Sequence, residues 1–251
     1  MPFFCKKLFS LLAGYVLVAT ACHAETLVIG VEDNQYLPHY SYENNEYQGF
    51  GRAVLDAFFS SMKHDYRYRA LPVARLFRSF VSREVDFKYP DNPLWSADLK
   101  AGLDIAYSAP VAATIDGVSV LPTNQNRRAD DIRILATVRG FTAPNWLERI
   151  QSGQVILAEN SSLSRAIQQT LMGRVDGTYA NIDVVEYLLR RELGQPQALV
   201  FEPALPHTRT YYYLSSIKYP DIITRFTAWM ENNPVVIEQL RKRYSLSLGE
   251  R

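Results

Sequence analysis

Two successive arrays of alternating strand and helix patterns run along this chain, and the alternation restricts the folds open to it. In the first array, β-branched and aromatic runs predict strands, and apolar residues at three- and four-residue spacings predict helices. These elements are strands at 26–31, 66–70 and from residue 85, with helices at 50–62 and 73–81. Such alternation indicates βαβ units and a mostly parallel sheet flanked by helices.

The alternation restarts after residue 130. Its elements are strands at 133–138, 155–158 and 175–180, helices at 144–150, 163–172 and 183–193, a strand at 211–215, and a helical segment at 219–245 interrupted before Pro234. A second array favours two similar α/β lobes over one long sheet. With 47% hydrophobic residues in 251, the chain can build a core in each.

The N-terminus has the pattern of an export signal. Lys6 and Lys7 precede a mostly apolar stretch over 8–21, and Cys22-His23-Ala24 supplies small residues at the −3 and −1 positions of a cleavage site. The apolar stretch is shorter than the twenty or so residues that a membrane span needs. We therefore expect cleavage after Ala24, so that 1–24 is a signal peptide and the protein is periplasmic. The alternative is a lipoprotein anchored at Cys22, because Ala19-Thr20-Ala21-Cys22 resembles a lipobox in which Ala19 replaces the usual Leu.

Charge and cysteine content restrict which partners the chain can have and how it is stabilised. Removal of residues 1–24 takes away Lys6 and Lys7, which leaves 25 cations against 26 anions and a net charge of −1. A near-neutral chain gives no reason to expect nucleic acid as a partner. Both cysteines, Cys5 and Cys22, lie in the leader, so the mature chain has no disulfide and depends on its core. We expect a monomer without a cofactor.

Several short motifs occur in the order seen in family 3 extracellular solute-binding proteins, the polar amino-acid type that serves ABC importers. The chain resembles that family through Tyr36-Leu37-Pro38-His39-Tyr40, Gly49-Phe50, Val85-Asp86, Tyr107-Ser108-Ala109-Pro110, Gly140-Phe141-Thr142 and Gly173-Arg174-Val175-Asp176. Each motif is weak alone, but together they cover nearly the whole mature chain.

The resemblance implies a Venus-flytrap fold with two lobes and two crossover strands. Its lobes would comprise 25–109 with 213–251, and 114–207, and its hinges would lie near 109–114 and 208–212. A small-molecule ligand would bind in the cleft and favour the closed state. The expected function is capture of a small polar, anionic or zwitterionic molecule for an ABC-type permease. The alternatives are a binding module that informs a membrane sensor, and a periplasmic dehydratase of the same fold.

Residues that follow the parallel strands are candidates for the cleft, because such loops face it. After the first strand come Glu32, Asp33, Tyr36 and Tyr40. A tyrosine there can stack on a ligand and donate a hydrogen bond. The alternative is that one of the two packs beneath the loop. In a dehydratase, Glu32 or Asp33 would be the acid or base.

A proline-fixed segment follows the third strand. Pro90 and Pro93 restrict the backbone around the candidate ligand-binding residues, which are Lys88, Tyr89, Asp91, Asn92 and Trp95. Charged, amide and aromatic side chains on a stiff loop form a pre-organised recognition surface. The alternative is an ordinary surface turn.

The resemblance breaks at two ligand-binding positions. The family places an Arg after this loop to clamp a carboxylate, but 91–110 contains no Arg, and Lys100 is its only cation. An ammonium cannot reproduce a planar guanidinium fork. Asn181 replaces the family's Asp for the α-amino group, with Asp183 nearby. We therefore expect weak binding of ordinary L-amino acids.

The second lobe offers a candidate anion site. Gly140, Phe141 and Thr142 lead into the helix predicted near Pro144, and free amides at a helix N-terminus suit a carboxylate. Arg139 would add a charge, unless it extends to solvent. Asn160-Ser161-Ser162 is better interpreted as a helix cap than as an anion site.

Sequence signals for catalysis are weak. His39, His64 and His207 stand alone without metal-ligand spacing, so each is expected to be a surface or cleft residue. The chain has no Gly-x-Ser-x-Gly elbow, phosphate loop or dinucleotide fingerprint. We therefore expect a binding protein, not an enzyme.

Overall fold

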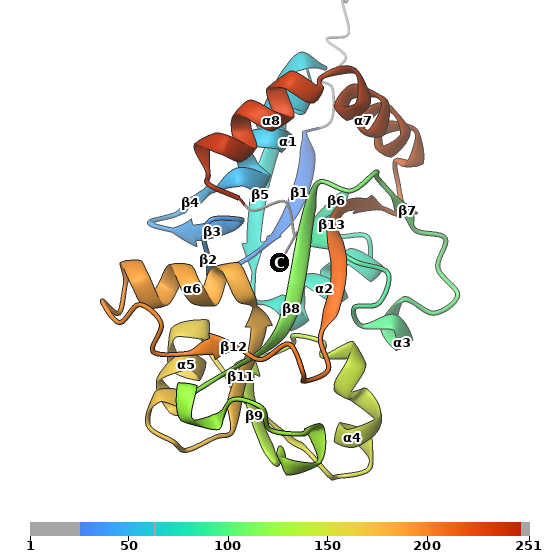
Figure 1. The fold of residues 1–251 in the computed structure, drawn as a ribbon. Coiled ribbons are helices and arrows are strands. Elements are labelled where there is room, and N and C mark those ends of the chain that lie inside the picture. The colour runs from blue at the N-terminus through green and yellow to red at the C-terminus, as the bar shows by residue number, and fades with distance from the viewer. Residues whose placement is uncertain (1–25, 63, 247–251) are drawn as a thin grey trace, which may run out of the picture.

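The computed structural model describes residues 26–62 and 64–246. They form two α/β lobes connected by long strands (Figure 1). The predicted signal peptide and Cys22 lie outside the described residues. Within the described part of the chain, no helix combines the length and apolar character that crossing a membrane requires.

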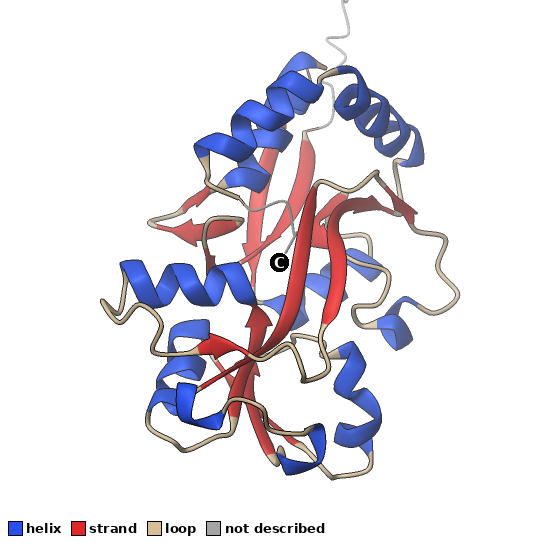
Figure 2. Cartoon of the chain, viewed as in Figure 1, coloured by secondary structure: helices blue, strands red, loops and turns tan. Residues whose placement is uncertain are grey.

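The first lobe, at the top of Figure 1, is built on a parallel sheet. Its central strand β1 (Leu27–Glu32) pairs with β5 (Tyr66–Leu71) on one side and β6 (Phe87–Asp91) on the other. The helices of this lobe lie outside the strands (Figure 2). They are α1 (Phe50–Ser61), α2 (Val73–Val81), α3 (Ala97–Lys100), α7 (Pro220–Asn232) and α8 (Pro234–Arg243).

The second lobe repeats this plan. Its strand β9 (Ile134–Val138) lies between β10 (Ile156–Asn160) and β11 (Gly177–Asn181), and both pairings are parallel. Its helices are α4 (Leu147–Gln151), α5 (Leu163–Leu171) and α6 (Ile182–Arg191), with single 3-10 turns at Pro122–Asn124, Ala129–Asp131 and Pro144–Trp146. A short strand, β12 (Val200–Phe201), pairs with β8 (Ala112–Val120).

Two nine-residue strands connect the lobes. β8 (Ala112–Val120) and β13 (Thr208–Ser216) are antiparallel, and their register runs from Ala112 opposite Tyr212 to Asp116 opposite Thr208. β13 also pairs with β6 in the first lobe, whereas β8 pairs with β11 in the second. The sheets are therefore joined only through this pair in the described structure, and the predicted two-crossover architecture is confirmed. The predicted lobe boundaries stay predictions.

Helix α1 buries the apolar stripe that predicted it. In α1, Val54, Leu55, Phe58 and Phe59 are buried, and the Phe58 ring lies 4.9 Å from that of Phe226 on α7. Each fully buried side chain of this size contributes about 1.5–3 kcal/mol from apolar burial. The spacing pattern thus defines which face of α1 packs into the core of its lobe.

A small antiparallel sheet between β1 and α1 was not predicted. It comprises β2 (Gln35–Tyr36), β3 (Tyr40–Glu43) and β4 (Glu46–Gln48). Asn44 and Asn45 both have positive φ, 52° and 62°, as a tight hairpin turn requires. This sheet holds Tyr36, whose hydroxyl reaches the Asn181 amide of the second lobe, and Tyr40, whose hydroxyl reaches Glu32 of the first lobe.

Candidate functional site

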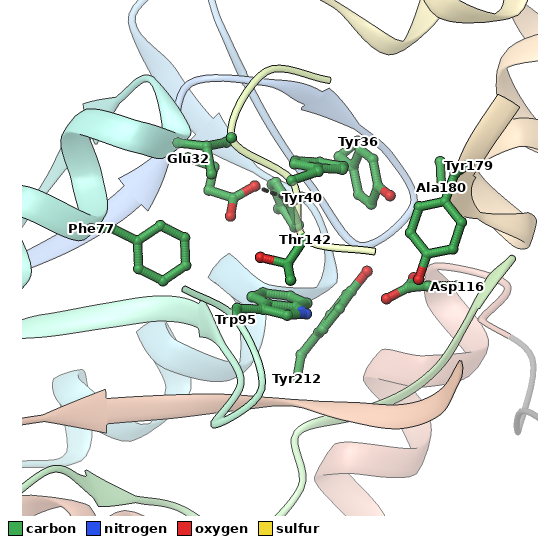
Figure 3. Close-up of a pocket in the computed structure, with 13 residues that line it drawn as sticks. Glu32, Tyr36, Tyr40, Phe77, Trp95, Asp116, Thr142, Tyr179, Ala180 and Tyr212 are labelled. Carbon is green, nitrogen blue, oxygen red and sulfur yellow. Dashed lines mark hydrogen bonds between the residues drawn. The ribbon is translucent and has the colours of Figure 1, made fainter. Parts of the chain in front are cut away.

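A cavity lies where the two lobes meet the crossover strands (Figure 3). Its lining comes from both lobes and is mainly aromatic: Glu32, Tyr36, Tyr40, Val73, Phe77, Trp95, Asp116, Gly140, Phe141, Thr142, Tyr179, Ala180 and Tyr212. The cavity volume is about 30 Å³, which is room for about two water molecules. The lobes are thus closed on one another.

The first lobe contributes a carboxylate held by a tyrosine. Glu32, at the end of β1, is buried and accepts a hydrogen bond of 2.5 Å from the Tyr40 hydroxyl. The Tyr40 ring stacks on that of Tyr36 at 5.1 Å between centroids. Burial raises the pKa of Glu32 above its ordinary value, while the positive charge of Lys88 opposes this rise.

The crossover strands contribute a second carboxylate and a large ring. Asp116 on β8 is 9% exposed and accepts a 3.1 Å hydrogen bond from the Thr114 hydroxyl through Oδ1. Burial raises the pKa of Asp116 to about 7, and the charge of Glu32 adds to this rise. Tyr212 on β13 packs edge-on against Trp95, at 5.6 Å.

The second lobe adds apolar and hydroxyl groups. The ring of Phe141 meets that of Tyr36 edge-on at 5.4 Å. The hydroxyl of Tyr179 is buried and has no hydrogen-bond partner among the described residues. In Figure 3 this hydroxyl lies beside the carboxylate of Asp116. The cavity therefore combines two carboxylates, aromatic faces and an unpaired hydroxyl.

Direct contacts hold the lobes together around the cavity. The Asn181 amide donates to the Tyr36 hydroxyl at 2.9 Å, and the Ser96 amide donates to Thr142 Oγ1 at 3.3 Å. Gly140 has a φ of +88°, and a Cβ on it would approach the Ala74 nitrogen on α2 to 3.0 Å. Gly140 thus permits a close approach between the lobes.

Six of the residues predicted for ligand binding line this cavity. They are Tyr36, Tyr40, Trp95, Gly140, Phe141 and Thr142. Their positions agree with the expectation that residues after parallel strands converge at the cleft. Their contact with a ligand stays a prediction.

The predicted recognition loop is in part a buried strand, which corrects the sequence interpretation. Lys88, Tyr89 and Asp91 belong to β6 and are fully buried. Pro90 is compatible with a strand here because the ladder between β6 and β13 is irregular between its pairs at Asp91 and Lys88, where a missing N–H is tolerated.

The two lysines predicted for the site share one buried aspartate. Asp91 accepts from Lys100 at 2.7 Å and lies 3.4 Å from Lys88 Nζ, and it also accepts from Ser215 at 2.6 Å. Lys88 Nζ lies 4.1 Å from the centroid of Phe77, behind the cavity wall. Burial lowers the pKa of Lys100 to about 8. This cluster supports the wall and does not line the cavity.

Two other residues of this segment also have packing roles. A Cβ at Gly51 would lie 2.2 Å from the Tyr89 ring, so Tyr89 packs against the start of α1. Asn92 Nδ2 donates to Thr210 Oγ1 and the Tyr211 carbonyl, both at 2.9 Å. Asn92 therefore ties the segment to β13.

Two backbone donors of the anion site expected at 140–142 are already paired, which argues against an anion there. The Gly140 amide donates to Glu159 Oε1 at 3.0 Å, and the Phe141 amide donates to the Val138 carbonyl at 3.0 Å. Arg139 is largely exposed and lies 3.7 Å from Glu159. A carboxylate already occupies the position that a ligand anion would take.

The predicted residues on α6 also face other groups. Asn181 is the buried N-cap of α6, where its Oδ1 accepts from the Asp183 and Val184 amides. Asp183 lies on a separate groove beside Leu37 and Pro38. Ser162 caps α5 by accepting from the Arg165 amide, as the sequence predicts.

Several lining residues were missed from the sequence. Asp116, Tyr179 and Tyr212 lie inside long strands of the lobes and crossovers, whereas the prediction considered only the segments that follow the predicted parallel strands. A lone acid within the apolar run 111–120 was the available signal for Asp116.

His39 was predicted to be a surface or cleft residue and is neither. It is buried beside Tyr212, with 5.0 Å between the ring centroids. Among the described residues, no cluster of three or more potential metal ligands occurs.

Comparisons with known proteins identify the fold. No family model matches the chain, and no curated protein matches it. Solved structures do: the arginine-, lysine- and histidine-binding protein ArtJ from Geobacillus stearothermophilus matches with a TM-score of 0.70 and 16% identity, over 88% of this chain and 95% of that one.

Two further matches have different roles. A histidine kinase sensor domain with similarity to periplasmic binding proteins has a TM-score of 0.70 and 16% identity, over 88% of this chain and 96% of that one. AncCDT-1, an ancestral amino-acid-binding protein and precursor of cyclohexadienyl dehydratase, has a TM-score of 0.66 and 14% identity, over 87% and 95%. The chain thus has the two-lobed fold of periplasmic amino-acid-binding proteins, in a divergent sequence.

Proposed function

We propose that this protein captures a small molecule in the bacterial periplasm by closing its lobes around it, delivers it to an ABC-type importer, and catalyses no reaction. The observation that carries the proposal is the origin of the cavity lining. Tyr36 and Trp95 come from the first lobe, Phe141 from the second, and Asp116 and Tyr212 from the crossover strands. A ligand that touches all of these surfaces binds the closed state more tightly than the open state, and therefore drives closure.

The size of the cavity supports a moving clamp. Its volume of about 30 Å³ leaves no room for an organic ligand, so the lobes must separate for one to enter and then close around it with the cavity enlarged. The interlobe contacts at Tyr36–Asn181 and Ser96–Thr142 are single hydrogen bonds, each with a net value of about 1 kcal/mol. Their loss on opening is compatible with repeated cycles of opening and closing.

Two measurements test the proposal. Native mass spectrometry of freshly purified mature protein should detect a bound small molecule. The mass of that molecule should stay unchanged when the complex is incubated. Thr224 on α7 and Met172, directly after α5, are exposed and lie on opposite lobes. A spin label is attached at each position through the substitutions Thr224→Cys and Met172→Cys. Their separation should be shorter in protein as purified than in protein unfolded, dialysed and refolded.

An unchanged distance after ligand removal would contradict the clamp. Conversion of the bound compound into a product would favour the dehydratase alternative. Delivery is tested separately, by measuring uptake of the recovered compound in cells with and without the gene for this chain. Normal uptake without the gene would favour the second candidate, a module for a membrane sensor, which the sensor domain of the same fold supports.

A further inference from the structure

The cavity lining carries negative charge only. Glu32 and Asp116 are its two ionisable acids, and no Lys, Arg or His belongs to the lining formed by the described residues. The nearest buried cations, Lys88 and Lys100, are both engaged by Asp91. Lys88 also lies behind the rings of Phe77 and Trp95.

Cationic groups that would bind a ligand carboxylate are absent from the lining formed by the described residues, and two of its backbone amides are already paired. The amides of Gly140 and Phe141 donate to Glu159 and Val138, and Thr142 accepts from the Ser96 amide. A ligand carboxylate in this cavity would thus meet two carboxylates and no cation in the lining, and this like-charge contact would weaken its binding.

Acceptor atoms, in contrast, are free to bind a donor. Asp116 accepts one hydrogen bond, at Oδ1 from Thr114, and its Oδ2 has no donor among the described residues. Tyr179 is 2% exposed, and its buried hydroxyl likewise has no hydrogen-bond partner in the described part of the chain. Both groups line the cavity and lie side by side in Figure 3. Together they offer a ligand N–H group two oxygen atoms.

Aromatic faces complete a site for a cation. Tyr36, Tyr40, Trp95 and Tyr212 lie around the same space. Aromatic faces attract cations through their quadrupole, and the attraction grows when water is excluded. They also cover the hydrocarbon part of an amphipathic ligand.

Building on the proposed capture function, we propose that the ligand is a small organic amine in its protonated form, without a carboxylate. Its ammonium group would donate to Asp116 Oδ2 and to the Tyr179 hydroxyl, with Glu32 adding a second negative charge. Its hydrocarbon part would lie against the aromatic rings. This differs from the anionic or zwitterionic ligand expected from the sequence.

Three matched probes test the ligand class on the full mature protein after ligand removal by unfolding and refolding. They are 2-phenylethylamine, 2-phenylethanol and 3-phenylpropionate, which share a phenylethyl skeleton and differ in charge. L-arginine and L-glutamate represent ligands that carry an ammonium group and a carboxylate together. We expect only the amine to raise the melting temperature, since only it binds the folded state. Titration calorimetry then gives the dissociation constant.

Asp116→Asn keeps the shape and removes the charge, and should weaken amine binding at least about tenfold. Tyr179→Phe should weaken it about fivefold. Asp104→Asn changes net charge by the same amount at an exposed position of the first lobe and should leave affinity unchanged. Circular dichroism verifies that each variant is folded.

The outcomes separate this inference from the capture function. Binding of the carboxylate or an amino acid in preference to the amine would overturn the amine assignment and leave capture intact. An amine affinity unchanged in Asp116→Asn would also overturn it. If no probe binds and the protein as purified carries no small molecule, both proposals fail.

Discussion

The hydroxyl of Tyr36, on the small sheet of the first lobe, accepts a 2.9 Å hydrogen bond from the backbone amide of Asn181, which begins α6 in the second lobe. Both residues are buried. The bond therefore exists only when the lobes are closed. It stabilises the closed state relative to the open state and does not contribute to the folding of either lobe alone.

Tyr36→Phe should shift the protein toward the open state. The variant leaves the buried Asn181 amide without an acceptor, which costs about 2 kcal/mol in the closed state. We expect weaker binding of 2-phenylethylamine by about 30-fold, with a longer mean spin-label distance between the lobes. Tyr42→Phe, on the same sheet, removes a hydroxyl without a hydrogen bond in the described structure and is the control. Equal effects in the two variants would contradict the role assigned to Tyr36.

Asp91→Asn should destabilise the first lobe. Asp91 is fully buried and lies within 3.4 Å of both Lys88 and Lys100. Removing its charge leaves two buried cations close together, and breaking a buried pair in this way costs about 3–5 kcal/mol. Thermal unfolding should show a melting temperature lower by about 10 °C or more. Asp98→Asn, exposed on α3, is the control and should unfold like the wild type.

The sequence patterns predicted most of the architecture because helix and strand periodicity reflect burial. The apolar stripe of α1 is such a case. The patterns failed where pairing partners are distant in sequence. Lys88 looked like a loop residue beside Pro90, but β6 is held between β1 and β13, and β13 lies more than 100 residues away.

Part of the candidate site could not be predicted for the same reason, because it depends on pairing between residues that are distant in sequence. Asp116 enters the cavity because β8 pairs with β13, with Thr208 opposite it, and local sequence does not encode that register. The prediction of an anion site at Gly140 missed a related long-range contact: the Gly140 amide donates to the carboxylate of Glu159, nineteen residues away. Tyr36 and Tyr40 were predictable because they directly follow β1.

Asp116→Asn should stabilise the protein at neutral and alkaline pH. Burial raises the pKa of Asp116 from 3.8 to about 7. A raised pKa means that the folded state binds the proton more tightly than the unfolded state does. The contribution of this carboxyl group to the free energy of unfolding therefore falls as the pH rises between about 4 and 7. The full change corresponds to about 4 kcal/mol. The variant avoids this loss.

We therefore expect the melting temperature of Asp116→Asn to exceed that of the wild type by several degrees at pH 8, with the difference shrinking toward pH 4. Calorimetric unfolding scans across this range measure the difference, and Asp104→Asn is the charge-matched control. A difference that does not depend on pH would show that the carboxylate of Asp116 is not the titrating group. A variant that is more stable and binds 2-phenylethylamine less tightly would indicate that Asp116 is retained for binding at the expense of stability.

Gly140→Ala should impair closure more than folding. Gly140 has a φ of +88°, and its missing Cβ would lie 3.0 Å from the Ala74 nitrogen and 3.3 Å from Val73 on the opposite lobe. A side chain at a positive φ costs about 1–2 kcal/mol wherever it occurs, but the contact with α2 exists only in the closed state.

Gly173→Ala supplies the matched control. Gly173 lies in the same lobe as Gly140 and also has a positive φ, +67°, but a Cβ there meets nothing within 4 Å. Both variants should therefore lose similar stability in thermal unfolding, whereas only Gly140→Ala should lengthen the spin-label distance in the presence of 2-phenylethylamine and weaken its binding, by about fivefold or more for each kcal/mol of clash. If Gly173→Ala weakened binding equally, backbone strain and not the interlobe contact would explain the effect. The pair of glycines thus separates the energy of folding from the energy of closing.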